Sequence, residues 1–243
     1  LLGLNSKKTW EKVLFFSMGI SGIYGMMISG TRGAMIVPMI GGFMYILHRK
    51  NFKFILIGTM MMAAVYVFFA HTYVGQSYYE IRRMRTAFRP EDDASLQVRL
   101  ENRRILKGYL RTRPFGGGIG SAGDWGRRFS PQGFLAQIPT DSWYVQIWAE
   151  QGIVGLLLHL IILSYIVVKS SYLIMFKLKD PILRGRMSAL VAAFTGIMGA
   201  SYGNGVLGQM PTGAITYMSW VFLFLSPMFD EQIKMLKAKN AQN

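Results

Sequence analysis

The chain has 243 residues, 51% of them hydrophobic, and a mean hydropathy of +0.28, which is unusual for a soluble domain. Its formal net charge is +15, with 27 lysines and arginines against 12 aspartates and glutamates. Such a charge is typical either of a nucleic-acid-binding protein or of a membrane protein with basic connectors. Because there is no cysteine, disulfide bonds and thiolate chemistry are excluded.

The distribution of the basic residues favours a membrane protein. Eleven of the twelve lysines lie in termini and connectors that an alternating topology places on one side of a membrane, and only Lys107 lies on the other. By the positive-inside rule that side is the cytoplasm. Most arginines lie in one long segment on the far side, and long loops escape the rule. We therefore expect membrane lipids as partners and no nucleic acid.

Six apolar runs predict transmembrane helices, because each approaches the roughly 20 residues that span a bilayer. Unlike the helices of a soluble bundle, they carry few polar residues on any face. The runs are Val13–Ile28, Gly33–Leu47, Phe54–Ala70, Val145–Val168, Met187–Ala200 and Ala214–Phe229. We expect an all-α polytopic membrane protein with about six transmembrane helices. Since the chain begins with Leu1 rather than methionine, we expect it to be part of a longer bundle.

The apolar runs divide the chain into three parts. Residues 1–70 are expected to form three transmembrane helices, and residues 144–243 three more with a cytoplasmic basic tail. Between them, residues 71–143 are expected to form a large helical loop on the outer, periplasmic side. This loop is the one segment long and polar enough to hold a working site.

A helix predicted from Ser95 to Leu110 in the loop carries Arg99 and Arg103 on its apolar side. At 100° per residue, both arginines fall within the same arc as four leucines: Leu96, Leu100, Leu106 and Leu110. An unpaired buried charge is costly, so these arginines need an anionic partner. Alternatively, their long side chains extend toward lipid headgroups.

A glycine-rich element, Pro114-Phe-Gly-Gly-Gly-Ile-Gly-Ser-Ala-Gly123, follows that helix. Its second half formally matches the dinucleotide-binding fingerprint. The fingerprint requires a preceding strand and a later acidic residue, whereas a helix and a proline precede this element. We expect no nucleotide cofactor here. The glycines predict either a close approach between two backbones or an ordinary loop.

Asp141, just before the fourth apolar run, has two interpretations. Asp and Ser before a helix are common N-caps, but a carboxylate there also suits a general base. Glu150 is out of phase with Asp141 on the helix and shares a face with Gln146, where it is expected to line a cavity. His71 is an alternative base, and His159 is expected to make a helix–helix hydrogen bond. No His, Asp or Glu spacing typical of a metal site is present.

The order of these motifs resembles that of the O-antigen ligase and polymerase superfamily, whose members are bacterial envelope glycosyltransferases. The resemblance runs from about Phe16 to Leu160. It rests on Ser29-Gly-Thr-Arg-Gly33 after a span, the long outer loop, the glycine-rich element, and Asp141-Ser142 followed by nine residues and Gly152-Ile-Val-Gly155. It implies the C-terminal part of a GT-C-like bundle. It also implies transfer of a glycan from an undecaprenyl diphosphate carrier, without a metal or cofactor, at the periplasmic face of the inner membrane.

The resemblance also implies roles for individual residues. Arg32 and Arg99 match the family's diphosphate-binding arginines, and Arg103, one turn further on, would support Arg99. Asp141 departs from the pattern, because ligases of the superfamily carry histidine there as the candidate base. This departure favours a polymerase of lipid-linked oligosaccharide repeats over a ligase that transfers the glycan to lipid A core or protein. A transporter or flippase of lipid-linked anionic sugars is the third hypothesis. It is less favoured because the charges lie in the outer segment and no internal repeat is evident.

Overall fold

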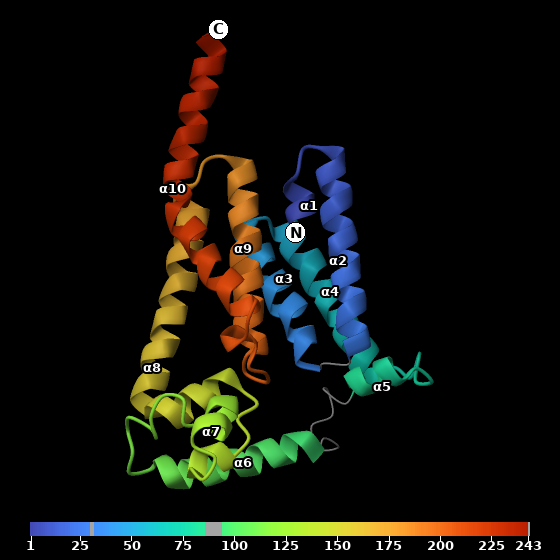
Figure 1. Cartoon of the computed structure of the whole chain (residues 1–243). Helices are drawn as coiled ribbons and strands as arrows, with labels where there is room; N and C mark the ends of the chain where they lie inside the picture. Colours follow the sequence, from blue (N-terminus) through green and yellow to red (C-terminus); the bar gives the residue numbers. More distant parts are fainter. Residues whose placement is uncertain (30–31, 86–93, 243) are drawn as a thin grey trace.

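The computed structural model describes residues 1–29, 32–85 and 94–242, and in these ranges it is helical with no strand (Figure 1). The predicted all-α class is therefore confirmed. The helices and short turns are α1 (Leu2–Asn5), α2 (Thr9–Ser29), η1 (Arg32–Met35), α3 (Ile36–His48), α4 (Phe52–His71), α5 (Tyr79–Arg85), α6 (Ala94–Leu110), α7 (Gly123–Phe129), η4 (Phe134–Gln137), α8 (Trp143–Tyr172), η5 (Leu173–Lys177), α9 (Pro181–Ala200), η6 (Val206–Gly208) and α10 (Thr212–Gln242).

Each of the six predicted apolar runs forms a helix, and among the described residues four helices are long and apolar enough to cross a membrane. These four are α2, α4, α8 continued by η5, and α10. Helix α3 belongs to a shorter apolar segment, Gly33–His48, and α9 does not meet the same criterion of length and composition. Four candidate spans are thus present among the described residues, while the count of six spans stays a prediction.

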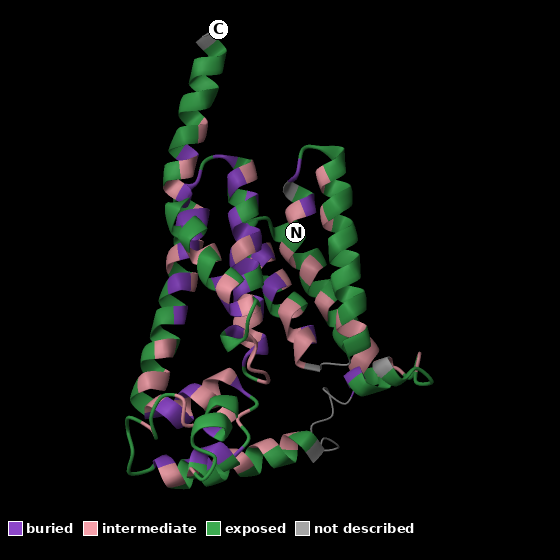
Figure 2. Ribbon diagram, in the orientation of Figure 1, coloured by how far each residue is buried: buried purple, intermediate pink, exposed green. Residues whose placement is uncertain are grey.

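Helix α9 is the centre of the bundle, and Figure 2 shows burial concentrated along it. Helices α3 and α9 pack with their backbones in contact. A Cβ added at Gly41 would lie 2.6 Å from the carbonyl oxygen of Ala192, and one at Gly196 would lie 2.5 Å from that of Val37. Small residues at such positions let membrane helices approach closely, which increases their van der Waals contact.

Helices α2 and α4 have no buried residue, and both are apolar on all sides. Figure 2 shows α2 exposed along its length. A helix that is hydrophobic all round is covered by lipid or by further protein. Their exposed apolar side chains therefore agree with a bilayer around the bundle.

Lysine-bearing connectors lie at the opposite end of the bundle from the outer segment, residues 71–143 (Figure 1). At that end Lys50 Nζ donates to the carbonyl oxygen of Met175 (2.7 Å), and Lys237 Nζ lies 2.6 Å from Asp180 Oδ2. Burial alone would raise the pKa of Asp180, but hydrogen bonds from Lys237 and from the Leu183 and Ile182 amides hold that pKa below its ordinary value. The ion pair with Lys237 is therefore kept at neutral pH.

Helix α8 contains a sharp break at Gly152. The fourth apolar run, Val145–Val168, predicted one uninterrupted helix, whereas the observed helix begins at Trp143, reaches Tyr172 and is interrupted at Gly152 (φ 66°, ψ −167°). This backbone conformation is essentially restricted to glycine. The prediction of an uninterrupted helix was wrong because Gly152 lies inside an apolar run that gives no sign of a turn.

The glycine-rich element docks across this break. The amides of Gly117 and Gly118 donate to the carbonyl oxygens of Ala149 and Glu150 (2.9 Å each). The amide of Val154, beyond the break, donates to the carbonyl oxygen of Pro114 (3.2 Å). Backbone groups that a broken helix leaves unpaired are thus satisfied.

The fit leaves no room for side chains at two of these glycines. A Cβ at Gly116 would overlap the backbone of Glu150 and Gly152, and a Cβ at Gly152 would overlap the backbone of Pro114 and Gly116. The predicted close approach of two backbones is therefore confirmed. Its partner is the break in α8.

Replacing Gly152 by alanine should destabilise the fold. The backbone conformation alone costs an L-residue about 1–3 kcal/mol, and the overlap with Pro114 adds to that cost. The midpoint of thermal unfolding of the purified protein in detergent should fall by several degrees. Gly108→Ala is the matched control, because nothing lies within 4 Å of its added Cβ and alanine is the better helix former. A Gly152→Ala protein that unfolds at the wild-type temperature would contradict this account.

Candidate functional site

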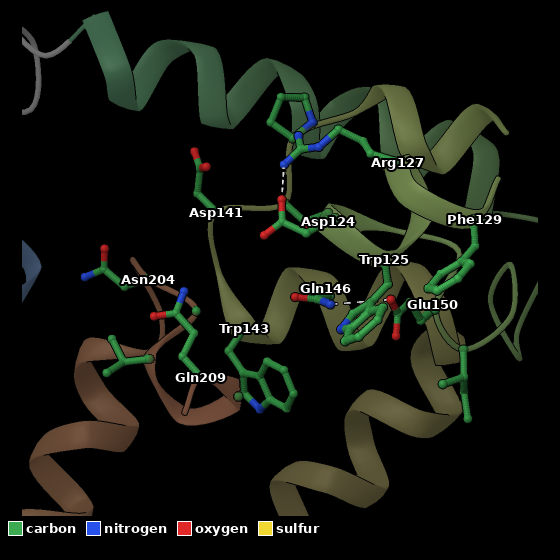
Figure 3. Close-up of a pocket in the computed structure, with 18 of the residues that line it drawn as sticks. Asp124, Trp125, Arg127, Phe129, Asp141, Trp143, Gln146, Glu150, Asn204 and Gln209 are labelled. Carbon is green, nitrogen blue, oxygen red and sulfur yellow. Dashed lines mark hydrogen bonds and ion pairs between the residues drawn. The ribbon is translucent and has the colours of Figure 1, made fainter. Parts of the chain in front are cut away.

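A pocket of about 1050 Å³ opens in the outer segment, beyond the end of the bundle. Its walls are α6, α7 with the loop before it, residues 139–141, the part of α8 before Gly152, and the turn between α9 and α10. Figure 3 shows Asp141, Asn204 and Gln209 on one side, and Trp125, Phe129 and Glu150 on the other. The pocket thus has two ends, which we call the Asp141 end and the Trp125 end.

The start of α8 is anchored to the α9–α10 turn. The amide of Trp143 donates to the carbonyl oxygens of Ser201 and Asn204 (3.2 Å each), and Ser142 Oγ donates to Ser201 O (3.3 Å). The N-cap residue is Ser142, and it makes no side-chain capping bond. The N-cap interpretation of Asp141 is therefore wrong. Its carboxylate is left to line the pocket.

Arg99 of α6 pairs with Asp141, with 3.2 Å between Arg99 Nε and Asp141 Oδ2. Asp141, the candidate base, is thus the anionic partner that we expected for Arg99. The two side chains are 34% and 52% exposed, so the pair contributes little to stability and separates at little cost. Within the described residues the Nη atoms of Arg99 make no hydrogen bond. They remain open to a further anion.

Arg103, one turn along α6, faces the α9–α10 turn instead of the main pocket. Its Nη1 donates to the hydroxyl of Tyr202 (2.8 Å), and its guanidinium lies 4.7 Å from the centre of that ring. Arg103 also lines a small cleft together with Arg99 and Asp141. Its contacts tie α6 to the bundle. The expected part of Arg103 in diphosphate binding stays a prediction.

The side chain of Arg32 lies outside the described part of the structure, and only its backbone, at the start of η1, is placed. The next residue, Gly33, is so close to Asn204 that an added Cβ would overlap the Asn204 amide. Asn204 itself lines the pocket at its Asp141 end. The structure therefore brings Arg99 and Asp141 together and puts the backbone of Arg32 beside the same wall.

Glu150 is a second carboxylate in the pocket, and only 6% of it is exposed. Its Oε1 accepts hydrogen bonds from Gln146 Nε2 and from the amide of Ala122 (3.4 Å each). The predicted shared face with Gln146 and the predicted cavity are confirmed. We expected Glu150 and Asp141 on different faces because both were assigned to one helix. In the structure Asp141 precedes that helix. Both carboxylates line one pocket (Figure 3).

Several lining residues were missed from the sequence. Trp125 and Phe129 belong to α7, a helix of seven residues that is too short to give a clear periodic signal. Asn204 and Gln209 are brought in by the α9–α10 turn, more than 60 residues after Asp141. Because Trp125 and Phe129 are four residues apart, their spacing did indicate that they share one face of a helix.

The other candidate residues lie elsewhere. His71 ends α4 with its ring 5.9 Å from that of Tyr66, and it does not line the pocket. His159 Nε2 accepts a hydrogen bond from Trp143 Nε1 (3.1 Å). This bond joins the two parts of α8 across the Gly152 break, not two different spans as expected. Within the described residues, no group of three or more His, Asp or Glu side chains could hold a metal ion.

Comparison with known proteins gives one match. The family model described as O-antigen ligase matches residues 16–160, which is more than half of the chain. The matched region contains Arg32, Arg99, Arg103, Asp141 and Glu150, together with the glycine-rich element. No curated protein and no solved structure shows significant similarity to the chain.

The contact between Arg99 and Asp141 can be tested by cross-linking, because the chain has no cysteine of its own. A protein carrying Arg99→Cys and Asp141→Cys should be linked by a short bifunctional thiol reagent, since the two side chains meet in the structure. Peptide mass spectrometry detects the link. The control pair is Arg104→Cys with Asp141→Cys, because Arg104 is exposed on another face of α6. Equal linking of both pairs would contradict the described site.

Proposed function

The chain belongs to the O-antigen ligase family, and from this we propose that it is a metal-independent membrane glycosyltransferase that polymerises undecaprenyl-diphosphate-linked oligosaccharide repeats. The observation that carries the proposal is the Arg99–Asp141 pair at one end of a pocket outside the bundle. A phosphate-binding group and a proton acceptor are thereby adjacent. Glycan transfer from a diphosphate carrier needs both at one place.

The proposed location is the bacterial inner membrane, with the pocket facing the periplasm. This orientation is supported by the lysine-bearing connectors, which lie at the end of the bundle away from the outer segment (Figure 1). Lysine-rich connectors are typical of the cytoplasmic side. A lipid carrier whose diphosphate lies at the outer surface of the bilayer would reach a pocket just beyond the ends of the spans.

In the proposed reaction, a hydroxyl oxygen of the acceptor sugar attacks the anomeric carbon of the donor glycan. The bond from that carbon to the diphosphate oxygen breaks, and its electron pair leaves with the carrier diphosphate. The hydroxyl proton passes to the carboxylate of Asp141. A positioned carboxylate in this role typically contributes about 10²–10⁴-fold to the rate.

Arg99 has two tasks in this scheme. Its Nε holds Asp141 in place, while its two Nη atoms, which make no hydrogen bond among the described residues, are available to the phosphate oxygens. A guanidinium stays charged and presents parallel N–H groups that match phosphate geometry. It therefore stabilises the negative charge that develops on the leaving diphosphate. Arg103 keeps α6 in position through Tyr202, and the backbone of Arg32 lies at the start of η1.

Transfer to an acceptor other than a growing chain is the second candidate function. It is favoured by the description of the matching family as O-antigen ligase. The polymerase assignment is favoured by Asp141, which occupies the position where ligases of the superfamily carry histidine. In both cases the lipid-linked glycan is the donor, and the acceptor is either another glycan or a lipid A core.

Asp141→Asn should abolish polymer synthesis, because an amide cannot accept the hydroxyl proton. In cells that lack the wild-type gene and express this variant, we expect long envelope glycans to fall by about 100-fold or more on a gel. Single repeats should still reach their acceptor. Glu101→Gln is the matched control, since Glu101 is an exposed carboxylate of α6 that does not line the pocket.

The other outcomes of this experiment are equally informative. Full-length polymer made by Asp141→Asn protein at wild-type abundance would remove Asp141 from the mechanism. In cells that lack the gene altogether, long glycans that accumulate on the carrier would identify a ligase. Repeats trapped on the cytoplasmic side in those cells would identify a transporter.

A further inference from the structure

The Trp125 end of the pocket has an exposed aromatic surface. Trp125 and Phe129 lie one helical turn apart on α7, and both line the pocket. Their rings stack in parallel, with centroids 5.7 Å apart and 6° between the planes. Trp125 is 56% exposed and Phe129 is 69% exposed. Such large apolar surfaces are left open in a folded protein chiefly where something binds.

The same pocket is lined by a polar pair on α8. Gln146 and Glu150 are joined by the hydrogen bond to Oε1, and the amide of Ala122 holds the same oxygen. Glu150 Oε2 has no hydrogen-bond partner among the described residues. In the view of Figure 3 the Trp125 indole overlaps the hydrogen bond between Gln146 and Glu150. An aromatic face, an amide and an unused carboxylate oxygen thus line one pocket.

This combination suits a sugar ring. A pyranose has faces of C–H groups that pack on an aromatic ring, and equatorial hydroxyls that hydrogen-bond at its edge. Carboxylates accept from hydroxyls, while amides both donate and accept. Aromatic side chains combined with a few placed polar groups are usual in small-molecule sites. A lipid surface is less well matched, since Glu150 is a nearly buried carboxylate and the aromatic rings line a pocket.

We propose that the Trp125 end is a sugar-binding subsite, in which Trp125 and Phe129 stack on a ring of the glycan while Gln146 and Glu150 bind its hydroxyls. This inference rests on the proposed function and extends it, because it separates recognition of the glycan from the chemistry at Asp141. The subsite holds the chain of sugars at one end of the pocket. The reacting hydroxyl and the diphosphate meet at the other end.

The subsite is tested by saturation-transfer NMR on the purified full chain in nanodiscs. The probe is the host's own repeat-unit oligosaccharide after its release from the carrier lipid, so that it carries no phosphate. The wild-type protein should transfer saturation to the ring C–H protons. Trp125→Ala should weaken binding by about tenfold, as is usual when an aromatic anchor is truncated.

Three further variants separate the effects of stacking, folding and hydrogen bonding. Trp125→Phe should keep most of the binding, because a phenyl ring still stacks, and this result would show that the site is intact. Phe115→Ala is the matched control, since Phe115 is 73% exposed in the same outer segment but does not line the pocket. Glu150→Gln should weaken binding through the lost charge-assisted hydrogen bond.

The binding measurement tests whether the subsite exists, independently of the proposed role of Asp141. Absence of saturation transfer to the wild-type protein, or unchanged binding by Trp125→Ala, would overturn the subsite, even if the Asp141→Asn protein makes no polymer. If Asp141→Asn protein makes full polymer while Trp125→Ala loses binding, the subsite stands and the proposed chemistry fails.

Discussion

The backbone at Gly152 is the constraint on which the rest of the outer segment depends. A backbone N–H or C=O that is buried without a partner costs free energy. Gly152 is buried, so a break in the helix there is stable where another segment of backbone supplies those partners. Gly117, Gly118 and Pro114 supply them across the break, and glycine at 116 and 152 allows the approach. The conformation at Gly152 and the glycine-rich element thus require each other.

Because of this break, the two parts of α8 lie in different surroundings. The part of α8 before Gly152 packs against the outer segment and carries Gln146 and Glu150 into the pocket, while the part after it enters the bundle. The hydrogen bond from Trp143 to His159 joins the two parts. Because the α9–α10 turn caps the start of α8, Asp141 is not needed for capping. Its carboxylate is available to Arg99 and to the pocket.

Much of the fold can be predicted from the sequence, because the length and composition of an apolar run indicate whether it forms a membrane helix. The apolar runs gave the helices, and the position of Arg99 on an apolar face predicted an anionic partner that proved to be Asp141. The break in α8 was missed because glycine within an apolar run has several explanations. Asn204 and Gln209 were missed because their contribution depends on a turn distant in sequence. The capping role was assigned to Asp141 where Ser142 occupies that position.

We propose that one guanidinium binds the carrier diphosphate while it orients Asp141, and this is measured as binding of undecaprenyl diphosphate to the purified protein. Arg99→Lys keeps the positive charge but loses the paired N–H groups of the guanidinium. We expect this variant to bind the lipid about tenfold more weakly than wild type. We expect Asp141→Asn to bind it at least as well as wild type. Equal affinity for wild type, Arg99→Lys and Arg99→Gln would show that Arg99 takes no part in holding the diphosphate.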